Sequence, residues 1–215
     1  MYKKYFKHEK GITGLETAII LIAFVVVAAV FAYTALSAGL FSTQKAQEAV
    51  YSGLKEAQST LELRGGIVAT ANTVGATGNI KQLTFVVSNA LGGDPIDFTE
   101  PSPASDNSGV ADTNSSNKVV INYIDSNQVV SNLFWTCTPL GTNDGDDLLE
   151  TGEKFQITIG YDTAGQGGGN LIDALDPTFL SVNDTFTLEI MTNAGAVITI
   201  ERTTPAYIDL KMNLH

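Results

Sequence analysis

The chain has 215 residues, of which 44% are hydrophobic, and its 12 basic and 23 acidic side chains give a formal net charge of −11. This acidic balance argues against nucleic-acid binding, which requires a basic surface. A single cysteine excludes an intramolecular disulfide framework. Two histidines, one near each end of the chain, argue against a histidine-based catalytic triad or a multi-histidine zinc site.

The first residues of the chain are basic, and a long apolar run follows them. Residues 1–11 contain four lysines and one glutamate, whereas residues 17–44 contain no charged side chain. As a helix, those uncharged residues would extend about 42 Å, which is enough to cross a bilayer. The pattern predicts a membrane-spanning helix with a cytoplasmic basic leader. An uncleaved anchor and a cleaved secretory signal are alternatives, and the length of the run disfavours the secretory signal.

Beyond Gln44 the chain becomes amphipathic without a break. Apolar side chains recur every three or four residues, at Ala46, Val50, Leu54, Ala57 and Leu61. This spacing places them on one face of a helix. The first strong stop signal is Gly65-Gly66. We therefore expect one helix from about Thr13 to Leu63, apolar all round in its first half and requiring one covered face in its second half.

From Gly66 onward the hydrophobic period changes from 3.6 to 2, which is typical of β-strands. The alternation predicts strands near residues 83–87, 118–124, 128–138, 155–161 and 186–190. The span Thr185–Thr203 predicts a hairpin that turns at residues 192–195. No long amphipathic helix pattern separates these strands. The expected fold class is therefore α+β, with one long N-terminal helix followed by an antiparallel β-sandwich over residues 65–215.

The β-rich region carries most of the charge, with 18 acidic and 5 basic residues from 65 to 215. An acidic loop within it contains Asp144, Asp146 and Asp147. Clustered carboxylates on a turn suit a calcium ion, but the spacing departs from that of an EF-hand. A solvated acidic turn is the main interpretation and a structural Ca²⁺ site the alternative; no other cofactor is expected.

The junction between the basic leader and the apolar run reads KGITGLET at residues 10–17, and after Ala18 it continues as IILIAFVVVAAVFAY. This segment resembles the start of an archaellin, an archaeal flagellin with the class III signal sequence of type IV pilin-like proteins. The resemblance is close over residues 1–65 and covers the rest only in general layout. It implies a leader at 1–11, a helix at 12–64 and an immunoglobulin-like outer domain at 65–215.

In this family a class III signal peptidase cuts before the apolar segment rather than after it. The resemblance therefore implies cleavage between Gly11 and Ile12, with Lys10 and Gly14 in the recognition sequence. Glu16 would lie five residues into the mature chain. It is expected either to neutralise the free α-amine of a neighbouring subunit, as in type IV pilins, or to interact with the dipole of its own helix.

The resemblance further implies a structural subunit of the archaellum filament, not an enzyme. The implied partners are other copies of the chain or other archaellins, the class III signal peptidase, and the archaellum assembly platform and motor. The expected location is an extracellular filament, with a precursor in the cytoplasmic membrane. Helix side chains expected to pack in the filament core include Leu21, Phe24, Val26 and Val30.

Two sequons for N-glycosylation occur, at Asn114 and Asn183, and archaellins are commonly glycosylated. Asn114, in a polar loop, is the better candidate. Catalytic motifs such as a Walker A loop, GxSxG or HExxH are absent from the sequence. The glycine-rich segment 165–169 is expected to form a flexible hairpin loop, and Cys137 to lie buried in an apolar strand.

Two alternative functions share this architecture. An adhesive type IV-like pilin would use the same leader and helix. A membrane-tethered extracellular binding module would keep residues 1–11 and stay monomeric. The sequence around the apolar run favours the archaellin.

Overall fold

The computed structural model describes residues 12–58, 61–90, 93–193 and 195–214. The chain divides into two units, Met1–Ser52 and Gly53–His215, which are described separately below.

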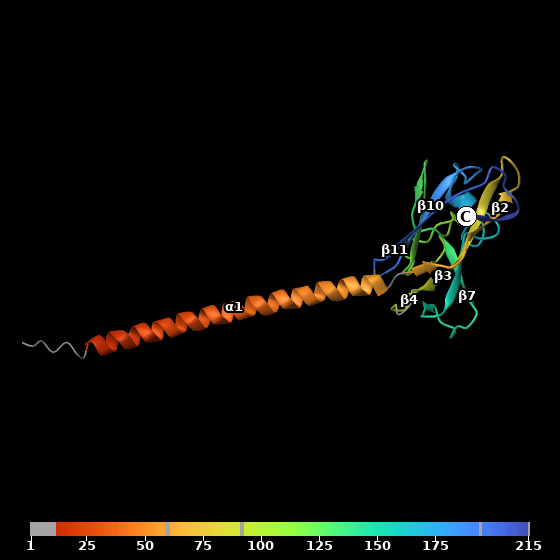
Figure 1. Ribbon diagram of the computed structural model, residues 1–215. Coiled ribbons are helices and arrows are strands. Elements are labelled where there is room, and N and C mark those ends of the chain that lie inside the picture. The colour runs from red at the N-terminus through yellow and green to blue at the C-terminus, as the bar shows by residue number, and fades with distance from the viewer. Residues whose placement is uncertain (1–11, 59–60, 91–92, 194, 215) are drawn as a thin grey trace, which may run out of the picture. The chain divides into compact units, whose positions relative to one another are not determined.

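The helix α1 spans Ile12–Gln58, 47 residues, as one continuous helix (Figure 1). At 1.5 Å per residue it is about 70 Å long. The prediction that it continues to Leu63 is wrong, because Leu61–Leu63 form the strand β1. Leu61 is buried and pairs with Asn89 of a neighbouring strand. Burial at a sheet therefore decides the conformation of a residue whose spacing also suits a helix.

The described strands form a larger sheet, a smaller sheet and a short two-stranded ladder, and every pairing among them is antiparallel. The larger sheet has the order β12-β2-β3-β9-β7, and β1 pairs with β3 beside β2. Its strands are β1 (Leu61–Leu63), β2 (Ile67–Thr73), β3 (Asn79–Asn89), β7 (Trp135–Leu140), β9 (Lys154–Ile159) and β12 (Lys211–Leu214).

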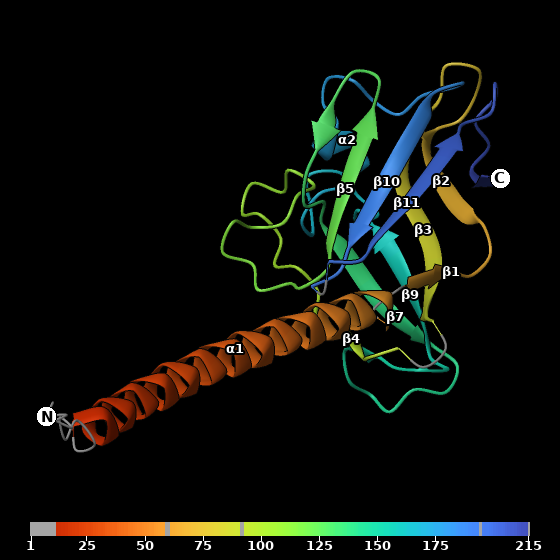
Figure 2. The same ribbon diagram turned by 60° about the vertical axis from the view of Figure 1, so that its left-hand side comes forward.

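The smaller sheet has the order β11-β10-β5-β6. Its strands are β5 (Val120–Asp125), β6 (Val129–Val130), β10 (Thr185–Met191) and β11 (Val197–Thr203). The hairpin predicted over residues 185–203 is present, with Met191 paired to Val197. Figure 2 shows β5, β10 and β11 side by side in one layer, with β3, β9 and β7 in another. The ladder joins β4 (Ile96–Asp97) to β8 (Leu148–Leu149).

The strand predicted over residues 128–138 is two strands in two sheets. The chain leaves β6 of the smaller sheet after Val130 and enters β7 of the larger sheet at Trp135. Asn132, between them, has a φ of 54°. Asparagine tolerates this left-handed conformation better than most residues, and it breaks the extended backbone.

The hydrophobic core lies between the two sheets and takes its side chains from alternate positions of both. Fully buried examples are Phe85, Phe155, Trp135, Tyr123 and Phe186. Phe98 packs edge-on against Trp135 and Phe155, with ring centroids 5.9 and 5.8 Å apart. Alternation with period 2 thus produces the face that each strand buries. The strands and their connections from Leu61 to Leu214 are called the β-unit below. The fold class expected from the sequence, one long apolar helix followed by antiparallel sheets, is confirmed.

The glycine-rich segment 165–169 is not the flexible hairpin loop that its composition suggests. It links β9 to the short helix α2 (Leu171–Ala174) and packs against the loop before β5. The Gly168 carbonyl accepts from the Gly109 amide at 2.9 Å, and the Gly168 amide donates to Asn107 Oδ1 at 2.9 Å. Gly169 has a φ of 82°, and a Cβ there would lie 2.1 Å from the Asn107 carbonyl oxygen. Glycine is needed for this close backbone approach.

Candidate assembly surface

Helix α1 exposes its apolar side chains to solvent. The span Gly14–Leu54 is long and apolar enough to cross a membrane. Its most apolar 18-residue stretch has a mean hydropathy of 2.8, and none of that stretch is buried by the described part of the chain. Large hydrophobic side chains such as Ile20, Phe31 and Phe41 are more than half exposed. A surface of this kind is unfavourable in water, so it must be covered by lipid or protein.

The predicted assembly residues lie on this surface but not on one face of it. Phe24 is 73% exposed and Val26 is 55% exposed, and the exposed fractions of Leu21 and Val30 lie between these two values. At about 100° per residue, Leu21 and Phe24 lie on one side of the helix, and Val26 and Val30 lie on the opposite side. Glu16 is also exposed on α1. The apolar surface is therefore a collar around the helix, not a single stripe, and one neighbouring helix could not cover it.

Two threonine hydroxyls within the uncharged part of α1 bond to the backbone of their own helix. Thr34 Oγ1 donates to the Phe31 carbonyl at 3.0 Å, and Thr43 Oγ1 donates to the Leu40 carbonyl at 2.9 Å. These hydroxyls satisfy themselves on their own helix, as threonine can in an apolar environment. Charged side chains reappear after this part, where Lys45 and Glu48 form an exposed ion pair at 2.6 Å.

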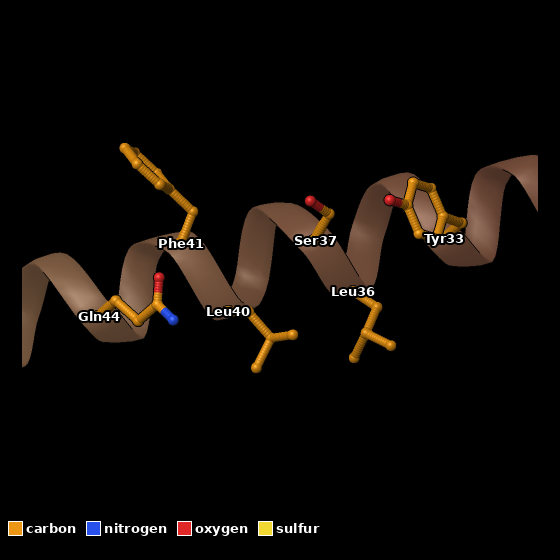
Figure 3. A pocket seen from close by; sticks show the side chains of 6 residues that line it. All are labelled: Tyr33, Leu36, Ser37, Leu40, Phe41 and Gln44. Carbon is orange, nitrogen blue, oxygen red and sulfur yellow. The ribbon is translucent and has the colours of Figure 1, made fainter.

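A groove of about 290 Å³ runs along α1 between Tyr33 and Gln44. Two rows of side chains spaced four residues apart border it: Tyr33, Ser37 and Phe41 in one row, and Leu36, Leu40 and Gln44 in the other. Figure 3 shows Ser37 and Phe41 pointing to one side of the helix and Leu36 and Leu40 to the other. This groove was not predicted from the sequence, although the four-residue spacing of its two rows could have indicated it.

An archaeal-type flagellin family model matches residues 11–202. The chain belongs to this family. A probable flagellin of Archaeoglobus fulgidus is 38% identical over 229 aligned positions, which cover 100% of this chain and 99% of the relative. The solved archaeal flagellum of Methanospirillum hungatei matches with 30% identity and a TM-score of 0.58, over 94% of this chain and 98% of that chain. The flagellin chain is thus a structural subunit of an archaeal flagellar filament.

A crystal structure of an archaeal flagellin from Methanocaldococcus jannaschii matches the chain with a TM-score of 0.50. It covers 72% of this chain and 95% of that chain at 12% identity. At this identity the match supports the fold alone.

The predicted cleavage site of the flagellin falls at the edge of the described residues. Lys10 and Gly11 lie outside them, and Ile12 is the first residue of α1. Gly14 lies on α1, and apart from the adjacent backbone of the helix no described atom lies within 4 Å of the place that a Cβ would occupy. The cleavage site stays a prediction, as does the role of Glu16.

Both sequon asparagines of the flagellin are exposed on the β-unit. Asn114 lies in the loop before β5, and its amide donates to Asp112 Oδ1 at 2.7 Å. Asn183 lies in a tight turn with a φ of 57°, and the hydroxyl of its sequon residue Thr185 contacts that of Thr203 at 2.8 Å. Glycosylation at either asparagine stays a prediction.

The acidic loop does not gather its carboxylates around a common point. Asp144 Oδ1 accepts from the Asp146 amide at 3.3 Å, and Asp146 Oδ1 accepts from the Leu148 amide at 2.9 Å. Asp147 is exposed beside them. In the described part of the chain no group of three or more His, Cys, Asp or Glu side chains could hold a metal ion. The Asp144 and Asp146 carboxylates instead cap turns of the loop.

Cys137 is half-buried rather than fully buried, on the edge strand β7. Its amide donates to Glu100 Oε1 at 2.6 Å. Burial, and then the nearby Glu100 and Asp147 carboxylates, raise the pKa of the thiol to about 12. The thiolate is the reactive form, so this cysteine is poorly suited to act as a nucleophile.

Proposed function

We propose that the flagellin is made as a membrane-inserted precursor and assembles through α1 after its leader is removed. The leader, residues 1–11, stays on the cytoplasmic side. Cleavage between Gly11 and Ile12 frees the mature chain, whose helix enters the filament core. Residues 65–215 then form the outer shell, and a membrane motor rotates the filament for swimming. The observation that carries this proposal is the uncovered apolar collar of α1 in a chain of the flagellin family.

The free energy of apolar burial supports assembly through the helix. Burying one Leu, Ile, Val or Phe side chain is worth about 1.5–3 kcal/mol. Such side chains surround α1, among them Ile19, Ile22, Val25, Val27 and Phe31. Since they point in all directions, several neighbouring helices must cover each copy. A helical filament supplies such neighbours by repeating one heterologous contact.

The order of events follows from the distribution of charge. The leader is basic, and basic segments next to a membrane span stay on the cytoplasmic side. Four lysines at the end of an apolar helix would be costly to bury in a filament core, so they must be removed first. The partners that follow are the class III signal peptidase, the assembly platform and the motor. The role assigned to the chain is structural and not catalytic.

N-terminal sequencing of filaments purified from the cell surface tests this proposal. We expect the mature chain to begin at Ile12. A filament protein beginning at Met1 or Tyr2 would contradict the cleavage step and favour an uncleaved anchor. A Gly11→Val variant should accumulate as a longer membrane precursor. The matched control Gly39→Ala should be processed normally, because Gly39 lies mid-helix with open space around its Cβ position.

A glycan on Asn114 is a second part of the proposal. The side chain is exposed and lies in a loop, where an N-linked sugar meets no packed surface. Mass spectrometry of filament peptides should show a mass increment on the peptide that contains Asn114 and lose it in Asn114→Gln. An unmodified wild-type peptide would contradict this assignment.

A further inference from the structure

The groove between Tyr33 and Gln44 is the least uniform part of the apolar collar. Its rows are i, i+4 ridges, and a ridge of a second helix packs between two such ridges. Ser37, between Tyr33 and Phe41, is small, so the row is low at its centre. The groove is therefore shaped to receive a helix at one defined level of α1.

Polar groups in this groove lack hydrogen bonds. The Tyr33 hydroxyl, the Ser37 hydroxyl and the Gln44 amide make no hydrogen bond within the described residues. Thr34 and Thr43, on the same stretch of helix, donate to their own backbone. All three unpartnered groups are solvated on the isolated chain. Once the helix is packed away from water, each would need a partner, because a buried polar group without one is costly.

We infer that this groove takes helix α1 of a second copy of the chain, and that Tyr33, Ser37 and Gln44 set the axial register between the two helices. This inference rests on the proposed assembly through α1. Between Ala18 and Ala32 the helix carries only apolar side chains. Sliding such a surface by one turn exchanges one aliphatic contact for another, so it specifies register weakly. A polar position in an apolar helical interface specifies register strongly, because only one alignment satisfies it.

A second copy is the occupant because the surface must be covered along its whole length. The collar on which the groove lies is not buried by the described part of the chain, and the chain belongs to a family of filament subunits. Lipid tails could cover the apolar side chains, but they supply no hydrogen-bond partner. Another α1 brings the same Tyr33, Ser37 and Gln44 groups, which can donate and accept.

The test is the helical symmetry of filaments carrying Tyr33→Phe, Ser37→Ala and Gln44→Leu together. The variant keeps the apolar bulk and removes the three polar groups. It should be expressed in cells lacking the wild-type subunit, and its filaments imaged by electron cryomicroscopy. We expect filaments in normal yield but with loss of the single rise and twist of the wild type. Wild-type rise and twist in every filament would overturn the inference.

Two control variants separate register from general packing. Thr43→Val removes a hydroxyl that is already bonded to the Leu40 carbonyl of its own helix. Thr34→Val removes a hydroxyl that is already bonded to its own helix. Both should keep the wild-type symmetry. A loss of symmetry in the controls equal to that in the triple variant would overturn the inference.

The two proposals fail in different ways. If wild-type filaments exclude α1 from their core, assembly through α1 is wrong. If α1 fills the core and the triple variant keeps its symmetry, only the register assignment is wrong. Should the triple variant form no filaments, the single change Ser37→Ala is read by the same criterion, and wild-type symmetry in its filaments would overturn the register assignment.

Discussion

Phe24 and Phe155 carry the same side chain in opposite environments. Phe155 is fully buried between the sheets of the β-unit, whereas Phe24 on α1 is 73% exposed. The β-unit covers its apolar surface with its own residues, and α1 covers almost none of its own. The stability of the β-unit is therefore a property of one chain, whereas the helix surface is stabilised only by lipid or by other copies.

Charge separates the two regions in the same way as burial. The uncharged span of α1 is free of repulsion between copies, and residues 65–215 carry 18 acidic against 5 basic side chains. An acidic surface keeps a protein solvated and opposes sideways association. A substitution should accordingly affect assembly when it lies on α1 and folding when it lies in the β-unit.

The largest expected effect is the loss of filaments in Val26→Asp. An unpaired carboxylate in the middle of an apolar helix is costly in a bilayer, by about 3 kcal/mol, and also in a packed core. Electron microscopy of the cell surface should show no filaments. The matched control Val129→Asp places the same charge on an exposed residue of β6 and should leave filaments intact. Normal filaments in Val26→Asp would contradict assembly through the helix.

The second effect is on the free energy of unfolding of the β-unit. It is measured by comparing Phe155→Ala with Phe24→Ala. Truncating a buried phenylalanine costs about 3–5 kcal/mol, so Phe155→Ala should lower the free energy of unfolding of the β-unit by that amount. Phe24→Ala should not change it. The chain's single tryptophan, Trp135, is buried in this core, so its fluorescence reports only this unit during denaturant unfolding of the detergent-solubilised chain. Equal losses in the two variants would contradict the separation of the two regions.

Hydrophobic period was sufficient to predict both regions and most strands, because it reflects which face each element covers. It failed where long-range contacts decide the conformation. Leu61 fits the helical spacing but is buried by pairing with Asn89, a residue distant in sequence. Segment 165–169 has the composition of a flexible loop, but its glycines allow close contact with Asn107. The collar of α1 was predictable from its lack of charge, whereas the groove depended on how neighbouring side chains are arranged.

A third and smaller effect is expected at the glycine-rich segment 165–169. It tests whether this segment packs closely against Asn107. Gly169→Ala would force a Cβ to within 2.1 Å of the Asn107 carbonyl oxygen at a φ of 82°. We expect a loss of about 3 kcal/mol in the same fluorescence assay. The control Gly165→Ala also has a positive φ but open space, and should cost about 1 kcal/mol. If the two losses were equal, the segment would not be packed as described.

The smallest effect concerns Cys137 and leaves stability at neutral pH unchanged. Its thiol pKa is raised from 9.0 to about 12 in the folded chain, mainly by burial. The folded state favours the neutral thiol over the thiolate. The contribution of the neutral thiol to the stability of the folded chain is therefore complete below about pH 9 and is lost as the pH rises toward 12. At pH 8.5 the thiolate fraction of the folded chain should be on the order of 10³-fold lower than in the unfolded chain. Iodoacetamide should therefore label the native protein slowly and the denatured protein rapidly, and equal rates would contradict the shielding of the thiol in the folded chain.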